Sequence, residues 1–226
     1  MSGAQPAAPW RSRAGRAVGR ALFSVPYRGR ARHTDRVPQI GPILLVANHA
    51  GVLDGPLVYT LTPRPVTFLV KQEAFTGPFG WVVRGVGQIP IDRTVGDRSA
   101  LAAAAGVLEH GGAVGVFPEG TRGEGDVAQV NQGAAWLALR TGARIVPVAV
   151  LGTRRPGGSA ERWPRPRSVL VADFGEPFAL AVDRSLPGRE RLRAASEHLR
   201  EMLAQHVQRA RVDNGEAPDA SDSRTL

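Results

Sequence analysis

Residues 43–56 read Ile-Leu-Leu-Val-Ala-Asn-His-Ala-Gly-Val-Leu-Asp-Gly-Pro, and this stretch decides the fold. Its first five residues are all apolar, which is typical of a strand that is buried on both faces. Gly51 allows a tight bend, and Pro56 suits the first turn of a helix. The stretch therefore predicts a strand, a turn and a helix in immediate succession, with His49 before the bend and Asp54 after it.

The spacing of His49 and Asp54 restricts how their side chains can meet. Residues five apart on one helix differ by about 140° in direction, so they do not share a face. The pair meets only if His49 ends the strand and the chain turns back before Asp54 begins the helix. An imidazole with a pKa of about 6.5 suits a general base, and a carboxylate on its second nitrogen fixes the tautomer and stabilises the imidazolium. We interpret His49 as a general base oriented by Asp54; the alternative is a loop histidine beside an aspartate that only caps the helix.

Short apolar segments and helical patterns alternate along the rest of the chain. The expected strands are 43–47, 66–70, 113–117, 145–150 and 169–174. Helices are expected over 100–109 with Asp97 as N-cap, over 133–140 with a stop at Gly142, and after Pro187. The last helix has an apolar stripe made of Leu192, Ala195, Leu199, Leu203, Val207 and Ala210. This alternation predicts an α/β fold whose sheet is covered by helices on both faces.

The net charge of +9 is concentrated at the start of the chain. Residues 1–36 contain eight arginines against Asp35, whereas the acidic residues outnumber the basic ones in the tail from 213 to 226. An amphipathic helix is expected from Trp10 to Val25, and it either lies in a membrane interface or packs on its own domain. We therefore divide the chain into a basic N-terminal segment with this helix (1–36), a catalytic domain (37–212) and a disordered polar tail (213–226).

Composition excludes several classes of site and of protein. The chain has no cysteine, so it has no disulfide, no thiol nucleophile and no Cys-ligated metal. Its apolar runs are far shorter than the roughly 18 residues of a membrane-spanning helix, and arginines interrupt the region where a signal peptide would lie. We expect a peripheral protein on the cytoplasmic face of the cell membrane, attached to an anionic membrane surface.

Three further motifs follow the His49–Asp54 stretch in order. They are Gly87-Gln88-Ile89-Pro90-Ile91-Asp92-Arg93, Phe117-Pro118-Glu119-Gly120-Thr121-Arg122 and Ile145-Val146-Pro147-Val148-Ala149. Together the four motifs resemble those of the glycerolipid acyltransferases, which make phosphatidic acid from 1-acylglycerol-3-phosphate. The resemblance runs from about residue 42 to about residue 175. It implies a mixed central sheet and the transfer of a fatty acyl group from acyl-CoA or acyl carrier protein to the free hydroxyl of the lysolipid, in phospholipid biosynthesis.

The acceptor phosphate needs a planar cation and backbone donors. Arg122 can bind it bidentately, and Gly120-Thr121 lets the main chain approach closely at the carboxyl end of a strand. The resemblance implies that Arg93 shares the glycerol phosphate, and it suggests Lys71, the only lysine, as a further contact. We expect Glu119 to orient Arg122 or the loop. The predicted substrate-binding residues are Lys71, Arg93, Glu119, Gly120, Thr121 and Arg122; the alternative is a set of surface loop charges.

Two details depart from the family pattern. Pro90 stands where an aromatic residue is common, and residues 130–133 lack the basic residue that often precedes the next helix. No serine or cysteine occupies a nucleophile-elbow pattern, which favours direct attack by the acceptor hydroxyl.

We expect no metal and no cofactor, because the five histidines form no H-E-x-x-H pattern and no dinucleotide or Walker loop is present. His198 and His206 are expected at the surface. Two alternatives are the same chemistry on another lysolipid and a basic nucleic-acid-binding protein. The second is disfavoured because no aromatic residue lies between the arginines from Arg11 to Arg20, so we expect no nucleic-acid partner.

Overall fold

The computed structural model describes residue 17 and residues 26–92, 96–120, 122–155, 158–183 and 185–215, apart from the side chains of residues 78 and 79. The helix predicted from Trp10 to Val25 falls almost entirely outside these ranges. Arg93, Thr121 and the tail from residue 216 also lie outside them.

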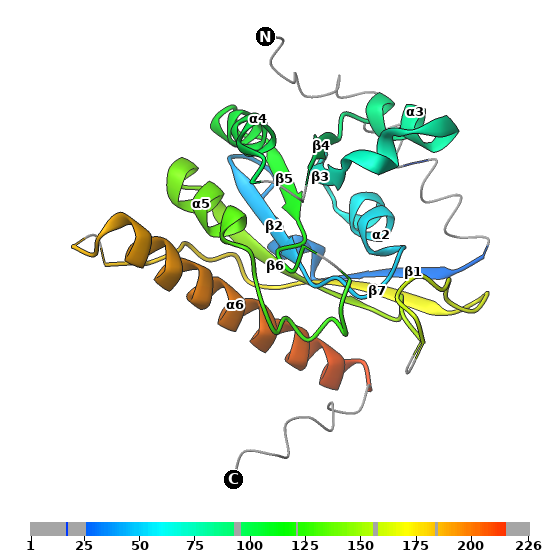
Figure 1. Ribbon diagram of the computed structural model, residues 1–226. Coiled ribbons are helices and arrows are strands. Elements are labelled where there is room, and N and C mark those ends of the chain that lie inside the picture. Colours follow the sequence, from blue (N-terminus) through cyan, green and yellow to red (C-terminus); the bar gives the residue numbers. More distant parts are fainter. Residues whose placement is uncertain are drawn as a thin grey trace.

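Strands and helices alternate along the described chain (Figure 1). The strands are β1 (Arg28–Arg32), β2 (Ile43–Ala47), β3 (Thr67–Lys71), β4 (Ile89–Ile91), β5 (Ala113–Val116), β6 (Arg144–Leu151) and β7 (Val169–Phe174). The α-helices are α2 (Asp54–Leu61), α3 (Gly77–Gly85), α4 (Arg98–Glu109), α5 (Gln132–Thr141) and α6 (Gly188–Asp213). Two 3-10 helices complete the set, η1 (Thr34–Arg36) and η2 (Gln72–Phe75).

The strands form one seven-stranded sheet in the order β1-β7-β6-β2-β5-β3-β4. β2 lies at its centre, between β6 and β5, and the strands from β2 to β6 all run in the same direction. β7 pairs antiparallel with β6, and β1 runs parallel to β7. The predicted mixed sheet is confirmed. The ends of strands β2 to β6 and the beginnings of β1 and β7 therefore share one edge, which we call the carboxyl edge.

Helices cover both faces of this sheet, as the sequence predicts. Leu44 and Val46 of β2 point into a core that contains the buried residues of α4, α5 and α6. Ile43, Leu45 and Ala47 point to the opposite face, where α2 packs. This alternation follows from the pleat, which sends successive side chains to opposite faces. Figure 1 shows α4, α5 and α6 in a row on one side of the sheet, with α2 on the other.

The expected strands and helices are found within one or two residues of their predicted bounds, but β1, β4, α3 and the two 3-10 helices were not predicted. β1 pairs with β7 over its whole length, and Tyr27 ahead of it is buried. The domain boundary predicted between residues 36 and 37 is therefore wrong, because the sheet begins by residue 28. Arg28, Arg30 and Arg32 lie in the predicted basic N-terminal segment, yet an edge strand can keep such side chains in water while its backbone pairs.

The long C-terminal helix packs with the predicted stripe. Ala195, Leu199, Leu203, Val207 and Ala210 are buried, and only Leu192 of the stripe is partly exposed. The expectation for His206 is wrong. Its ring is partly buried, and its Nε2 lies 2.9 Å from the carbonyl oxygen of Asp173 in β7. Burial lowers the pKa of His206, which favours its neutral form.

Among the helices that the structure describes, none combines the length and the apolar character that crossing a bilayer requires.

Asp97 caps the N-terminus of α4, and we expect this cap to stabilise the fold. Its Oδ1 accepts from the Ala100 amide at 3.0 Å and from the Ser99 hydroxyl at 2.6 Å, and its Oδ2 accepts from the Asp92 amide at 3.1 Å. These hydrogen bonds lower the pKa of Asp97 to about 2. Asp97→Ala should lower the free energy of unfolding at neutral pH by about 1 kcal/mol, the usual value of an N-cap.

The destabilisation caused by Asp97→Ala should become smaller as the pH falls. A lowered folded-state pKa contributes stability above the unfolded value of 3.8, and that contribution disappears as pH falls toward about 2. Denaturant titrations should therefore show the gap between wild type and Asp97→Ala narrowing between about pH 4 and pH 2. Asp97→Asn is the control, because it keeps a capping oxygen but has no charge. An unchanged gap at pH 2 would contradict the electrostatic part of this account.

Candidate active site

His49 and Asp54 meet across the turn that follows β2. Nδ1 of His49 lies 2.7 Å from Oδ2 of Asp54. Both residues are buried, at 7% and 0% relative exposure. β2 ends at Ala47, and Asp54 is the first residue of α2, so the predicted strand-turn-helix arrangement is present.

Asp54 organises the turn as well as the ring. Its Oδ2 also accepts from the backbone amides of Ala50, at 2.7 Å, and Gly51, at 2.8 Å. The side chain therefore points back along the chain and forms no capping bond to its own helix, whose N-cap is Leu53. This geometry excludes the alternative in which Asp54 serves only as a helix cap.

The hydrogen bonds assign the proton on the imidazole. An aspartate carboxylate can only accept, so in the carboxylate–imidazole form of the pair Nδ1 of His49 donates to Asp54 and Nε2 has a free lone pair. Nε2 makes no hydrogen bond to any residue that the structure describes. His49 is thus a hydrogen-bonded base whose second nitrogen is available to a hydroxyl.

Two sets of contacts hold the turn between β2 and α2 against the end of β6. A Cβ built on Gly51 would lie 2.6 Å from the carbonyl oxygen of Thr153, so only glycine fits this contact. The buried Asn48 side chain accepts from the Val150 amide at 2.7 Å, and it donates to the carbonyls of Val150 and Gly125. Asn48 therefore joins β2, β6 and the loop after β5.

Phe117 packs directly on the imidazole. Its ring centroid lies 4.3 Å from that of His49, with the two planes 25° apart, and Phe68 of β3 stacks behind Phe117 at 5.8 Å. The stack restricts rotation of the histidine and shields one of its faces from water. This favours a single productive ring orientation.

Glu119 supports the backbone of His49. Its Oε1 accepts from the His49 amide at 2.8 Å, and no bond joins it to Arg122 among the described residues. Burial is the main cause that raises the pKa of Glu119 to about 7, and the negative charges of Asp126 and Asp54 add to it, whereas the bond from His49 opposes the shift. Glu119 thus bonds the turn after β2, a contact that differs from both expected roles, orienting Arg122 or orienting its own loop.

The segment around Arg122 lies beside this turn. Gly120 has a φ of +74°, and a Cβ there would lie 2.4 Å from Nδ2 of Asn131, so the loop requires glycine. The Gly123 amide donates to the carbonyl oxygen of His49 at 3.0 Å, one residue after Arg122. Arg122 is partly buried and forms no ion pair with the described residues.

Of the other predicted phosphate contacts, the structure describes Lys71 but neither Arg93 nor Thr121. Lys71 is exposed at the end of β3, in register with Ile91 of β4, and therefore lies on the carboxyl edge. Arg93 follows Ile91 by two residues but falls outside the described residues, as does Thr121. No cluster of three histidine, cysteine or acidic side chains suited to a metal occurs in the described part of the chain.

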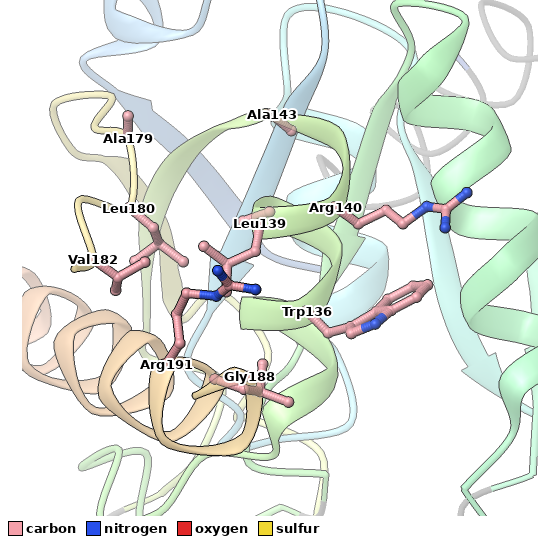
Figure 2. Close-up of a pocket in the computed structure, with 12 residues that line it drawn as sticks. Trp136, Leu139, Arg140, Ala143, Ala179, Leu180, Val182, Gly188 and Arg191 are labelled. Atoms are coloured by element: carbon pink, nitrogen blue, oxygen red, sulfur yellow. The ribbon is translucent and has the colours of Figure 1, made fainter. Parts of the chain in front are cut away.

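A separate groove lies at the opposite end of the sheet. It has a volume of about 650 Å³ and is bounded by the end of α5, residues 179–182 and the start of α6. Figure 2 shows Arg191 extending from α6 toward α5, whereas Arg140 points away from α6. Because Ala143 in its lining precedes β6, the groove does not adjoin His49, and we do not assign the acyl-transfer site to it.

Sequence reasoning missed the supports of the turn. Asn48, Phe117 and Arg154 were not singled out, although Asn48 and Phe117 lie inside the quoted motifs. Arg154 donates to the carbonyl of Gly123 and pairs with Glu124 at 2.7 Å. A polar residue directly after a fully apolar strand was the available signal for Asn48.

The chain is similar to known proteins in sequence. The family model described as Acyltransferase matches residues 29–151, more than half of the chain. A 1-acyl-sn-glycerol-3-phosphate acyltransferase of Bacillus subtilis is 28% identical over 171 residues, which cover 75% of this chain and 83% of that protein. A lyso-ornithine lipid O-acyltransferase of Pseudomonas aeruginosa is 36% identical over 119 residues, 51% of this chain and 45% of that protein. Several other relatives are likewise matched over only about half of their length.

The fold also matches a solved structure. The crystal structure of the 1-acyl-sn-glycerophosphate acyltransferase from Thermotoga maritima has a TM-score of 0.68 and is 23% identical, with 88% of this chain and 79% of that chain covered. At this identity the likeness concerns the fold. The family match includes the whole of the turn from His49 to Asp54 and the loop with Arg122. The chain therefore belongs to the acyltransferase family.

Proposed function

We propose that this enzyme transfers a fatty acyl group from an acyl thioester to the free hydroxyl of 1-acylglycerol-3-phosphate, giving phosphatidic acid. The observation that carries the proposal is the buried His49–Asp54 pair, whose Nε2 is available at the carboxyl edge of a sheet. Membership of the acyltransferase family supports the reaction class. The Bacillus subtilis relative, matched over most of its length, supports the acceptor.

The proposed reaction is a direct transfer. Nε2 of His49 takes the proton of the acceptor hydroxyl while the oxygen attacks the thioester carbonyl. The tetrahedral intermediate then collapses, the C–S bond breaks, and the imidazolium returns the proton to the leaving thiolate. Asp54 stabilises the imidazolium between these steps. A cysteine nucleophile is excluded because the chain contains none. The donor, acyl-CoA or acyl carrier protein, is a co-substrate, and no cofactor takes part in these steps.

We assign the acceptor phosphate to Arg122, with Arg93 and Lys71 as further contacts. Arg122 is suited to this role because it has no carboxylate partner among the described residues and belongs to the loop that bonds His49. Its planar guanidinium matches two phosphate oxygens. Lys71 supplies a point charge on the same edge.

A second acceptor class deserves testing because of the Pseudomonas aeruginosa relative, whose name gives a lyso-ornithine lipid as acceptor. The His49–Asp54 chemistry needs only a hydroxyl, so the cationic loop is what distinguishes acceptors. Transfer assays should compare 1-acylglycerol-3-phosphate with phosphate-free lysolipids, each with acyl-CoA and acyl carrier protein donors. Faster transfer to a phosphate-free acceptor would contradict the proposed substrate.

His49→Ala should abolish most of the transfer activity. Loss of a general base lowers turnover by about 10² or more. The measurement is kcat with 1-acylglycerol-3-phosphate, with circular dichroism to establish that the variant is folded. His110→Ala, at the end of α4, is the matched control and should retain activity. A folded His49→Ala enzyme with a near-normal rate would exclude the mechanism.

Asp54→Asn should also impair turnover, by about 10² or more. The amide oxygen can still accept from Ala50 and Gly51, but the amide nitrogen can donate to His49 and select the wrong tautomer. The rate loss should therefore exceed any loss of thermal stability. A variant that is less stable but fully active would show that Asp54 acts only on the turn.

Arg122→Lys should raise KM for a phosphate-bearing acceptor by about tenfold, because lysine keeps the charge but loses the bidentate fork. Phosphate-free acceptors should be affected little. Arg140→Lys, on the exposed surface of α5, is the control. Equal losses for both acceptor classes would instead indicate that Arg122 supports the loop.

We also propose that the enzyme attaches to the cytoplasmic face of the membrane, partly through residues 1–25. The basis is the excess of arginine in this segment, since each arginine near an anionic surface contributes about 1 kcal/mol. Removal of residues 1–25 should weaken co-sedimentation with anionic vesicles. Full co-sedimentation of the shortened chain would assign the attachment to the folded domain alone.

A further inference from the structure

A cationic surface with an exposed tryptophan lies on the loop between β6 and β7 and at the start of β1. Its members are Arg28, Arg162, Trp163, Arg165 and Arg167, which we call the hairpin patch. All five are exposed, and Trp163 has 62% of its surface in contact with solvent. Glu161 is the one acidic residue in the described ranges 26–32 and 158–169. No member of the patch forms an ion pair with another described residue.

Backbone hydrogen bonds hold the patch together. The Arg28 amide donates to Ser168 at 2.9 Å, and the Arg167 amide donates to Pro26 at 2.6 Å, so the two segments lie side by side. Within the loop, Arg162 bonds to Ser159 and Ser168 to Arg165. Pro164 is buried beside the exposed Trp163. The indole is therefore exposed on a loop that is held in place by hydrogen bonds and by a buried proline.

The hairpin patch lies on the same edge as His49. β6 ends and β7 and β1 begin at this edge. Thr153, at the start of the loop after β6, lies against Gly51 in the turn between β2 and α2. Arg154 bonds the loop that carries Arg122. Figure 1 shows the loop after β6 and helix α3 on the same side of the molecule, away from the start of α6.

A second exposed tryptophan lies farther along this edge. Trp81 of α3 is 78% exposed, and α3 follows η2 at the end of β3. In the sheet order β7 and β3 lie on opposite sides of β2, so Trp163 and Trp81 flank the strand that leads to His49. Tryptophan is enriched at the level of lipid head groups, where one side of the ring is apolar and the other is hydrated.

We propose that the hairpin patch binds the head groups of an anionic bilayer, with Trp163 inserted at the interface. This inference rests on the proposed function, because lipid acceptors must reach His49 from a membrane. Four arginines with little opposing charge match an anionic surface. The carboxyl edge of the sheet then faces the bilayer, and a lysolipid reaches His49 without leaving the membrane interface completely.

The test compares two triple variants of the full chain that remove equal charge. Arg28→Gln/Arg162→Gln/Arg165→Gln alters the patch, whereas Arg189→Gln/Arg191→Gln/Arg193→Gln alters the start of α6 at the opposite end of the sheet. Binding to vesicles of phosphatidylglycerol is measured by co-sedimentation. The patch variant should lose about a hundredfold in partitioning, on the basis of about 1 kcal/mol per arginine. The control should lose less than about threefold, because its charges lie beyond a Debye length of about 8 Å from the surface.

Equal losses in the two triple variants would overturn the proposal, since net charge alone would then explain binding. Vesicle binding by the patch variant equal to that of wild type would also overturn the proposal. Trp163→Ala should weaken binding severalfold at both low and high salt, because its contribution is apolar; no effect would exclude insertion. If the patch variant lost binding to random duplex DNA but bound vesicles as well as wild type does, the patch would be assigned to a nucleic acid and the proposal would be overturned.

Activity assays separate this inference from the proposed function. The patch variant should keep wild-type rates on a short-chain, water-soluble 1-acylglycerol-3-phosphate and lose rate on the same acceptor class in vesicles. If wild type transfers no acyl group to any acceptor yet the patch variant loses vesicle binding, the proposed function fails and the surface stands. If transfer is normal and both variants bind alike, the surface fails and the function stands.

Discussion

Oδ2 of Asp54 accepts hydrogen bonds from the His49 ring and from two backbone amides within the same short turn. A fully buried carboxylate is tolerated only when donors replace the water that it loses. Here all three donors lie on Oδ2, and they belong to the His49 ring and to the backbone of the turn itself. The shape of the turn, the tautomer of the histidine and the start of α2 therefore depend on one atom. Removing the carboxylate would disturb all three together.

The loop after β5 holds His49 from the other side. Glu119 accepts from the His49 amide, Gly123 donates to the His49 carbonyl, and Phe117 stacks on the ring. Both polar groups of the His49 backbone are thus bonded to residues of this one loop. Because β2 and β5 are paired neighbours, the register of two central strands fixes His49 relative to the segment that contains Arg122. The proposed acceptor cation and the base are positioned by the same contacts.

Local patterns account for what could be predicted from the sequence. The apolar run of β2, the bend at Gly51 and the cap at Asp97 are decided within a few residues, and all are present. The contacts that escaped prediction join distant parts of the chain. Asn48 bonds Val150, 102 residues away, and β1 pairs with β7 at the far end of the domain. Such contacts depend on strand order, which composition and periodicity do not encode. The arginines of β1 gave no strand pattern, because this edge strand pairs through its backbone while its side chains stay largely exposed.

The reversed direction of β1 and β7 has a consequence for how the chain enters the domain. Had β1 run with the central strands, its first residue would lie at the far end of the sheet, about 16 Å from the edge that contains His49 for a five-residue strand. A segment attached there would need several residues of extended linker merely to return to the site. With the observed direction, Pro26 ahead of β1 already lies beside the loop between β6 and β7. The direction of one edge strand thus brings the residues ahead of β1 to the edge of the sheet that contains His49.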